Sequence, residues 1–264
     1  MKRTASVFLV AVGACALLAP QIAPYSYERQ FREAIDAPPG PQFPLGTDAL
    51  GRDRFSRLLY ATRVSVLLAP GAAFVSVAIA LLVACLGLRG GSLAGHAVGG
   101  VTTICLSLPW IFLFIIMRAE LPLDTAPPAS VLLTFALMGV AGWAWPARVF
   151  TASIGQLSDA GWVVHARACG LSGWRIATVH MWPHLRDIAL AQFGVLVPAY
   201  ILSEASLGLL GLGVADPLPS WGNMLQDLQH PDLIRANPLI LAPLALLMLV
   251  MLCLENLRTP ETGL

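Results

Sequence analysis

The chain has 264 residues, of which 57% are hydrophobic and only 12% are charged. A soluble domain carries about 25% charged residues, so lipid must solvate much of this chain. The formal net charge of +1 comes without a dense basic run, which excludes nucleic acid as a ligand. The five cysteines stand singly, without the paired spacing of a zinc site, and we expect neither a metal nor a cofactor.

Six stretches are apolar over the roughly 20 residues that a membrane-spanning helix requires. The first also fits a secretory signal peptide, because Lys2 and Arg3 precede an apolar run. Since the chain continues into further apolar stretches, we interpret it as an uncleaved helix. The sequence thus predicts an all-α integral membrane protein with about six transmembrane helices. The expected spans are residues 5–23, 64–88, 97–117, 129–147, 188–212 and 238–254.

Hydrolysis of ATP by this chain is excluded, because a P-loop requires a lysine after its glycines and Lys2 is the only lysine. The sequence also contains no GxSxG elbow and no HExxH motif, so we expect no catalytic residue and no enzymatic activity. If the chain transports a solute, the energy must come from another polypeptide or from an ion gradient.

Three polar segments interrupt the apolar pattern. The first, residues 44–57, lies before the second span and combines glycines with alternating acids and arginines. Its composition favours a solvated amphipathic helix whose local ion pairs contribute little stability.

The second segment lies between the fourth and fifth spans. It predicts two short helices interrupted between Gly170 and Gly173, with Pro183 ending the second helix. A helix-turn-helix on the membrane surface that is rich in small residues suits docking into a groove of a soluble partner. The alternative is an ordinary interfacial helix anchored by Trp174 and Trp182.

The third segment places an acid, Glu204, inside the fifth span. A carboxylate in an apolar helix is costly unless it faces a wet cavity or a partner, so Glu204 is a candidate for a transport pathway. Small residues at Ala205, Gly208 and Gly211 allow close helix approach. Plain helix packing explains these glycines equally well.

In this order and at these distances, the three segments resemble the C-type permease family of dipeptide, oligopeptide and nickel ABC importers. The family pattern LGTDxxGRDxxSR is matched from Leu45 to Arg57, and EAxLxxLGLGxxxPxPSWGNML from Glu204 to Leu225. The family's EAA loop has the form EAARALGASDxRIxxxHxxP. Its matching positions here are Ala166, Arg167, Ala168, Gly170, Ser172, Arg175, Ile176, His180 and Pro183.

The resemblance implies a type I ABC importer permease fold, in which the loop at about residues 153–187 forms a cytoplasmic coupling helix seated in an ATPase. This loop departs from the family pattern at three positions. Val164 replaces the family's glutamate, His165 replaces an alanine and Gly173 replaces an acid. The loss of a carboxylate removes a polar contact to the ATPase.

The resemblance also implies partners and a location. The partners are a second permease subunit in a heterodimer, two cytoplasmic ATP-binding subunits and an extracytoplasmic solute-binding protein, in a bacterial or archaeal inner membrane. Both termini are expected in the cytoplasm, although this orientation places eight Lys and Arg residues on each side of the membrane.

We expect residues 1–62 to contain the first transmembrane helix and an extracytoplasmic amphipathic segment, and residues 63–264 to form a permease domain of five helices. Several residues of the family motifs have no clear role in the sequence. They are Gly46, Asp48, Gly51, Arg52, Asp53, Arg57, Trp221, Gly222 and Asn223.

The predicted function is a permease subunit that forms half of a translocation pathway for peptides or a related small solute. One alternative is an ion-gradient-driven secondary transporter that uses Glu204; it predicts inverted repeats, and the two halves show no convincing repeat. The other is a degenerate, non-transporting membrane scaffold, which is favoured only if the altered loop binds no ATPase.

Overall fold

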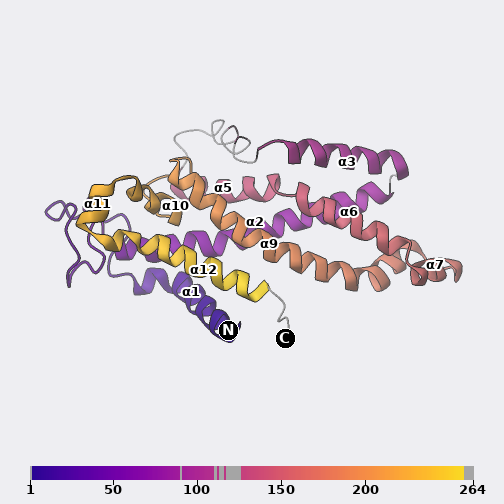
Figure 1. The fold of residues 1–264 in the computed structure, drawn as a ribbon, viewed down its shortest axis with the longest axis horizontal. Coiled ribbons are helices and arrows are strands. Elements are labelled where there is room, and N and C mark those ends of the chain that lie inside the picture. Colours follow the sequence, from indigo (N-terminus) through magenta and orange to yellow (C-terminus); the bar gives the residue numbers. More distant parts are fainter. Residues whose placement is uncertain (1, 90, 110–111, 113–115, 117–125, 259–264) are drawn as a thin grey trace. The chain divides into compact units, whose positions relative to one another are not determined.

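The computed structural model describes residues 2–89, 91–109, 112, 116 and 126–258. Its regular structure is helical, and strand pairing within these residues is limited to isolated bridges. The predicted all-α architecture is therefore confirmed (Figure 1). In chain order the helices are α1 (Lys2–Ile22), α2 (Arg54–Arg89), α3 (Gly91–Ser107), α5 (Pro127–Ala141), α6 (Ala144–Ser158), α7 (Gly161–Ala168), α8 (Gly173–Arg175), η1 (Ile176–Met181), α9 (Trp182–Leu209), α10 (Trp221–Met224), η2 (Leu225–Gln229), α11 (Pro231–Ala236), η3 (Pro238–Leu241) and α12 (Ala242–Arg258).

Among the described residues, five helical stretches are long and apolar enough to cross a membrane. They are Lys2–Ile22, Arg54–Gly87, Pro127–Ser158, Gly173–Leu209 and Pro238–Arg258.

The third of the six predicted spans, residues 97–117, is the one without a counterpart among these stretches. Its first part lies in α3, and most of its second part falls outside the described residues.

The predicted end of the fourth span at Arg148 is wrong, because this residue lies inside α6. The span is instead a bent pair of helices, α5 and α6. Pro146 lies in the first turn of α6 and cannot donate the backbone hydrogen bond that would continue α5, which accounts for the bend. Arg148 donates through Nη2 to Oγ1 of Thr103 in α3, at 2.9 Å.

Contacts divide the chain into two compact units. The first contains the described residues of Met1–Pro70, Arg118–Phe135 and Pro198–Leu264. The second contains those of Gly71–Met117 and Ala136–Val197.

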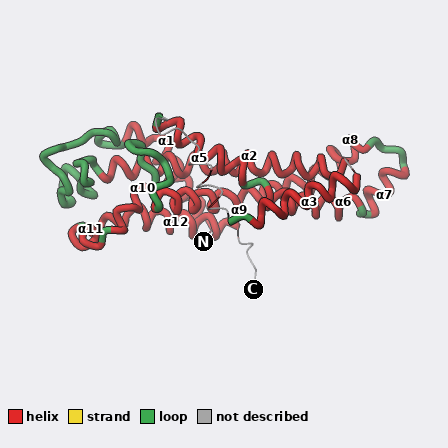
Figure 2. The backbone as a smooth tube through the Cα atoms, turned by 90° about the horizontal axis from the view of Figure 1, so that it is seen from above, coloured by secondary structure: helices red, strands yellow, loops and turns green. Residues whose placement is uncertain are grey.

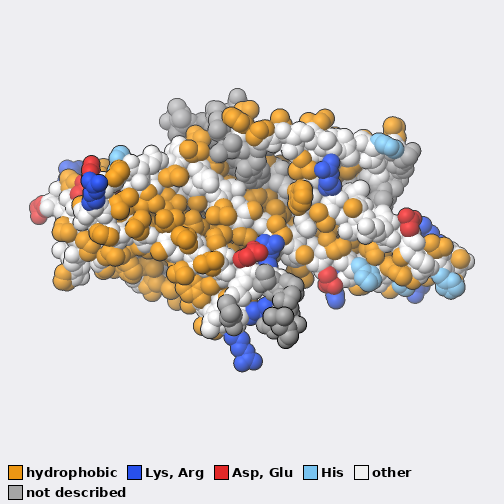
Figure 3. All heavy atoms as spheres, viewed as in Figure 1, with side chains coloured by type: hydrophobic (Ala, Val, Ile, Leu, Met, Phe, Trp, Pro, Cys, Tyr) orange, Lys and Arg blue, Asp and Glu red, His pale blue; other side chains and the backbone are white. Residues whose placement is uncertain are grey.

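In the first unit, α1 packs lengthwise on α12. The buried residues of α12 are Pro243, Leu247 and Val250, which a helical period places on one face. Its other side is apolar but exposed, and Figure 3 shows hydrophobic side chains along this helix. A helix with one face packed and another apolar face exposed is typical of a span in contact with lipid. The buried residues of α1 are Ala5, Val12, Ala16 and Ala19.

A long loop, residues 23–53, joins α1 to α2 in the same unit (green in Figure 2). It has an aromatic core of its own, in which the Phe31 ring centroid lies 4.9 Å from that of Tyr25 and 5.0 Å from that of Phe43. The Arg29 guanidinium lies 4.7 Å from the centre of the Phe31 ring. This core gives the loop a fixed shape without regular structure, and the loop leads directly into the site described below.

In the second unit, α2 and α5 approach closely. The Ser76 hydroxyl donates to the carbonyl oxygen of Gly139, and a Cβ at Gly139 would lie 3.1 Å from the carbonyl oxygen of Ala72. In the same unit α3 contacts α6, and α7 contacts η1. The second unit thus presents α7 and the turn that follows it at the end of long helices.

Candidate functional site

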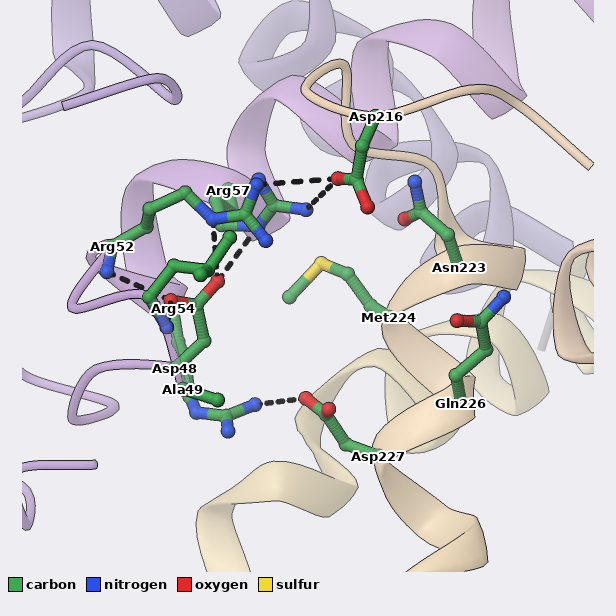
Figure 4. A pocket seen from close by; sticks show the side chains of 11 residues that line it. Asp48, Ala49, Arg52, Arg54, Arg57, Asp216, Asn223, Met224, Gln226 and Asp227 are labelled. Atoms are coloured by element: carbon green, nitrogen blue, oxygen red, sulfur yellow. Dashed lines mark hydrogen bonds and ion pairs between the residues drawn. The ribbon is translucent and has the colours of Figure 1, made fainter. Parts of the chain in front are cut away.

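Six charged side chains gather where the loop before α2 meets the segment after α9, all within the first unit (Figure 4). They surround a cavity of about 110 Å³, which Asn223, Met224 and Gln226 also line. We call them the arginine–aspartate cluster. Its members are Asp48, Arg52, Arg54, Arg57, Asp216 and Asp227.

Two glycines shape the loop that carries the first half of this cluster. Gly46 and Gly51 have φ values of 73° and 72°, in the left-handed region that favours glycine. A Cβ at Gly46 would also lie 2.5 Å from the carbonyl oxygen of Ala37, and one at Gly51 would lie 2.3 Å from that of Phe31. Both positions therefore exclude any other residue without a shift of the backbone.

Asp48 holds the turn and neutralises an arginine at the same time. Its Oδ1 accepts from the backbone N–H groups of Leu50 at 3.0 Å and Arg52 at 2.8 Å. Its Oδ2 accepts from Nε of Arg52 at 2.7 Å and lies 3.7 Å from Nε of Arg57. The aspartate of the family motif is thus a structural centre of the loop.

Asp53 caps the N-terminus of α2. Its Oδ2 accepts from the backbone N–H of Ser56 at 2.8 Å and from the Ser56 hydroxyl at 2.6 Å. An aspartate at this position satisfies a donor that the first helical turn leaves free. The helix therefore begins at Arg54, well before the start at residue 64 that hydropathy predicts.

The prediction of a solvated amphipathic helix for this segment is wrong. Arg52, Arg54 and Arg57 are only 8%, 5% and 5% exposed. Buried guanidinium groups require carboxylate partners. Asp48 supplies one from the loop itself, and two more come from the segment after α9. Oδ1 of Asp216 lies 3.2 Å from Nη1 of Arg52 and 3.4 Å from Nη2 of Arg57, and Asp227 accepts from Nη1 of Arg54.

A second buried polar group surrounds Glu204, which is 0% exposed. Its Oε2 accepts from the Ser65 hydroxyl at 3.1 Å. The Ser65 oxygen accepts in turn from the backbone N–H of Trp221 at 3.4 Å, and the Trp221 indole donates to Oγ1 of Thr62 at 3.1 Å. This network joins α2, α9 and α10.

Close glycine contacts hold the same helices together. A Cβ at Gly208 would lie 2.4 Å from the backbone of Gly222, and one at Gly222 would lie 2.7 Å from the carbonyl oxygen of Glu204. The predicted close approach at Gly208 is therefore confirmed. Gly211 has another role: with φ at 76° it ends α9, and the N–H of Leu212 bonds to the carbonyl oxygen of Leu207 at 2.8 Å.

The short helix α10 starts with a capping box. The Ser220 side chain accepts from the backbone N–H of Asn223, and the Asn223 side chain accepts from the backbone N–H of Ser220. Trp221 and Gly222 follow the cap and are buried. The motif residues at 221–223 thus position α10 against α9.

The helix-turn-helix expected between the fourth and fifth spans is present in the second unit. Helix α7 ends at Ala168 and is followed by Gly170 in the left-handed conformation, with φ at 77°, and the N–H of Leu171 bonds to the carbonyl oxygen of Ala166 at 3.2 Å. Ser172 then caps α8 by accepting from the backbone N–H of Arg175 at 3.4 Å. Among the remaining matched positions, Arg167, Ala168 and Pro183 are exposed and His180 is half-buried.

The prediction that Pro183 ends the second short helix is wrong. The chain continues from α8 through the π-helical segment η1 into α9, and Pro183 lies in the first turn of α9. The wider π-helical turn accommodates the missing N–H of a proline, so the helix is not interrupted. The indole of Trp162 packs over this segment, with ring centroids 6.3 Å from His180 and 5.5 Å from His184.

The sequence interpretation missed the two acids that complete the arginine–aspartate cluster, Asp216 and Asp227. The signal that could have found them is the group of arginines before α2, since buried arginines must be paired. Among the described residues, no group of three or more His, Cys, Asp or Glu side chains could hold a metal ion.

Apolar helical stretches of membrane-spanning length, together with an exposed helix-turn-helix, define a polytopic membrane protein. A family model described as "Binding-protein-dependent transport system inner membrane component" matches residues 76–259. The chain belongs to this family of inner membrane components. The resemblance drawn from the three polar segments is therefore confirmed.

Named relatives agree with this membership. The di/tripeptide transport system permease protein DppC of Pseudomonas aeruginosa (strain UCBPP-PA14) is 31% identical, over 83% of this chain and 72% of the relative. The glutathione transport system permease protein GsiD of Pectobacterium atrosepticum is 30% identical, over 94% of this chain and 80% of the relative. The dipeptide transport system permease protein DppC of Bacillus subtilis (strain 168) is 29% identical over 80% of this chain, and the match spans 64% of that relative. These relatives are transport permeases by name, in agreement with the prediction that this chain is not an enzyme.

Proposed function

We propose that the chain is a permease subunit of an ATP-binding-cassette importer and forms half of a translocation pathway for peptides or a related small solute. The family match over residues 76–259 carries this proposal. The names of the relatives support the solute class, because they refer to dipeptide, di/tripeptide and glutathione transport. Since the chain contains no P-loop lysine, separate ATPase subunits supply the energy.

The exposed turn between α7 and η1 is the contact for the ATPase in this proposal. Arg167, Gly170, Ser172 and Arg175 are all exposed there, at the end of helices that continue into α9. Because α8, η1 and α9 are continuous, a displacement of the turn by the ATPase would also move α9. Val164 is 52% exposed on α7, so this contact has an apolar side chain where the family pattern has a glutamate.

With the turn in the cytoplasm, both termini are also cytoplasmic and residues 213–237 lie outside. The arginine–aspartate cluster then lies on the extracytoplasmic side. The arrangement is consistent with the cost of charge in hydrocarbon, since Asp216 is 67% exposed at its side chain and needs water around it.

Glu204 is proposed as a residue of the pathway that becomes accessible during transport. It is 0% exposed in the isolated chain, and a partner subunit can only reduce exposure further. Access therefore requires a movement of Ser65, whose hydroxyl donates to Glu204 and accepts from the backbone of Trp221 in α10.

The proposed partners are a second permease subunit, two cytoplasmic ATP-binding subunits and an extracytoplasmic solute-binding protein. The test is purification of the tagged chain from native membranes in mild detergent, followed by mass spectrometry of every subunit that remains bound. Recovery of a second permease and a P-loop ATPase is the expected result. Recovery of the chain alone would contradict the proposal and favour a gradient-driven transporter or a non-transporting scaffold.

A further inference from the structure

Two buried guanidinium groups of the arginine–aspartate cluster share the same two carboxylates. Arg52 and Arg57 are 8% and 5% exposed, and both lie near Asp48 and Asp216. Figure 4 shows the two arginines pointing toward Asp216 at the edge of the cavity. Arg52 and Arg57 thus share one largely buried carboxylate, that of Asp48, and one largely exposed carboxylate, that of Asp216.

The two carboxylates are held very differently. Asp48 has a side chain that is 11% exposed, and it accepts two backbone hydrogen bonds besides its 2.7 Å contact to Arg52. Asp216 has a side chain that is 67% exposed, and its contacts to the arginines, at 3.2 and 3.4 Å, both use Oδ1. Charge-assisted hydrogen bonds of this kind are ordinarily 2.7–2.9 Å long, so Asp216 is the weaker partner of Arg52. Arg57 lies far from ideal distance to both acids, 3.4 Å from Asp216 and 3.7 Å from Asp48.

The space beside Asp216 can hold another group. The cavity measures about 110 Å³, whereas a water molecule needs about 10–15 Å³ on the same measure. It is lined by polar side chains, among them Asn223 and Gln226. Each of these amides already donates one hydrogen bond, to Leu218 and Gly208 respectively. The arginines are the cationic groups of the lining and therefore favour an anionic ligand.

The cost of leaving a buried arginine unpaired restricts which ligand can enter the cavity beside Asp216. If Asp216 leaves, Asp48 alone remains to balance two buried guanidinium groups, and one unpaired buried charge is strongly destabilising, so its departure is favoured when another anion takes its place. A carboxylate matches the planar guanidinium group in geometry and keeps the number of ion pairs constant. The exchange of one carboxylate for another is then close to balanced.

We propose that Arg52 and Arg57 form a binding site for a carboxylate, and that Asp216 covers this site while the ligand is absent. The chemistry of the site follows from the cluster itself. Only its location outside the membrane rests on the proposed function. The carboxylate is either the C-terminal group of a short peptide or an acidic side chain of a docked protein.

The test uses the full chain purified in mild detergent, with thermal unfolding as the readout. The variant Asp216→Ala leaves the arginines without their outer partner, and we expect it to unfold at a lower temperature than the wild type. Sodium acetate should raise the midpoint of this variant in a saturable manner and restore most of the loss. Sodium chloride at the same ionic strength should not, and the wild type should respond less because Asp216 competes with acetate.

The matched control is Asp232→Ala, which removes an exposed acid of α11 outside the cavity and should show no difference between acetate and chloride. If Asp216→Ala does not fold, Asp216→Asn keeps the side-chain size and should show the same preference for acetate. A variant as stable as the wild type, or an acetate response no larger than the chloride response, would overturn the proposal.

Two further probes distinguish the sources of the carboxylate. If dialanine stabilises the variant at lower concentrations than acetate does, and dialanine amide has no effect, the ligand is the carboxyl terminus of a free peptide. If acetate acts and dialanine does not, the site takes an acidic side chain from a docked protein. None of these measurements depends on uptake or on the ATPase, so a negative result here leaves the permease proposal untouched.

Discussion

The guanidinium of Arg54 donates to the carboxylate of Asp227, which lies 173 residues further along the chain. Arg54 is the first residue of α2, and its Nε also donates to the carbonyl oxygen of Thr47 at 2.9 Å. Asp227 lies in η2, after the capped helix α10. This ion pair connects the motif before α2 to the motif after α9, and the two motifs pack together in the first unit.

Removal of this pair should destabilise the first unit. Arg54 is almost buried, so Arg54→Gln and Asp227→Asn should each lower the thermal unfolding midpoint in detergent. Because each variant leaves the other charge unpaired, the double variant should lose less than the sum of the single losses, with a coupling of about 0.5–3 kcal/mol. The exposed pair of Arg258 and Glu255 is the control, and its coupling should be close to zero. Strict additivity of Arg54→Gln and Asp227→Asn would contradict a structural role for the pair.

Five of the six spans could be located from the sequence, though not all of their ends, because hydropathy acts locally, over the length of one helix. The role of the arginines before α2 could not be predicted from the sequence. Local composition makes Arg52 and Arg57 look like members of a solvated helix, and their exposed partner Asp216 follows about 160 residues later. Burial of a charge is decided by a partner that is distant in sequence, and a local pattern carries no information about it.

Roles of individual glycines and prolines were predictable only where the helix boundary was known. Gly208 packs against Gly222, as the small-residue pattern predicts, whereas Gly211 has the positive φ of a helix end. Pro183 looked like a helix terminator, but the π-helical segment before it takes up the missing hydrogen bond. The distinction depends on one or two residues of register, which periodicity does not fix.

Substitution of Gly208 by alanine tests the close approach of α9 and α10. The new Cβ would meet backbone atoms of Gly222 at 2.4 Å, and backbone cannot move aside as a flexible side chain does. We expect Gly208→Ala to destabilise the chain by about 1–3 kcal/mol or more, through overpacking. The control, Gly155→Ala in α6, adds a Cβ into open space and should stabilise its helix by about 0.5–1 kcal/mol. Opposite shifts of the thermal midpoint are expected, and equal shifts would contradict the close contact.

Two substitutions of Glu204 separate its size and hydrogen bonds from its charge. Glu204→Gln keeps an oxygen that can accept from Ser65, so we expect normal assembly and a thermal midpoint near that of the wild type. Glu204→Ala leaves the Ser65 hydroxyl without its acceptor and opens a cavity, which should cost about 1–3 kcal/mol. Measurement of solute uptake by the assembled importer then tests whether Glu204 has a role in the transport pathway. Loss of uptake in Glu204→Gln, with normal stability, supports a role for the charge in transport, whereas normal uptake shows that the charge is incidental.

Gly170 is the position at which the coupling assignment is most directly tested. Its φ of 77° and its N–H bond to the carbonyl oxygen of Arg167, at 3.0 Å, both serve the end of α7. Proline has no N–H and fixes φ near −65°, so Gly170→Pro must distort the turn. We expect ATP-driven uptake in proteoliposomes to be lost, while insertion into the membrane is unchanged because no spanning segment is altered.

Two further variants show whether the effect belongs to the turn. Gly170→Ala keeps the N–H and adds only the strain of a left-handed residue, about 1–2 kcal/mol, so it should retain part of the uptake. Gly161→Ala, at the start of the same helix, meets no atom within 4 Å and needs no positive φ, so it should behave like the wild type. The expected order of uptake is therefore Gly161→Ala, then Gly170→Ala, then Gly170→Pro. Full ATP-driven uptake by Gly170→Pro would overturn the assignment of this turn to the ATPase, because a contact that transmits force cannot tolerate the loss of the geometry that presents it.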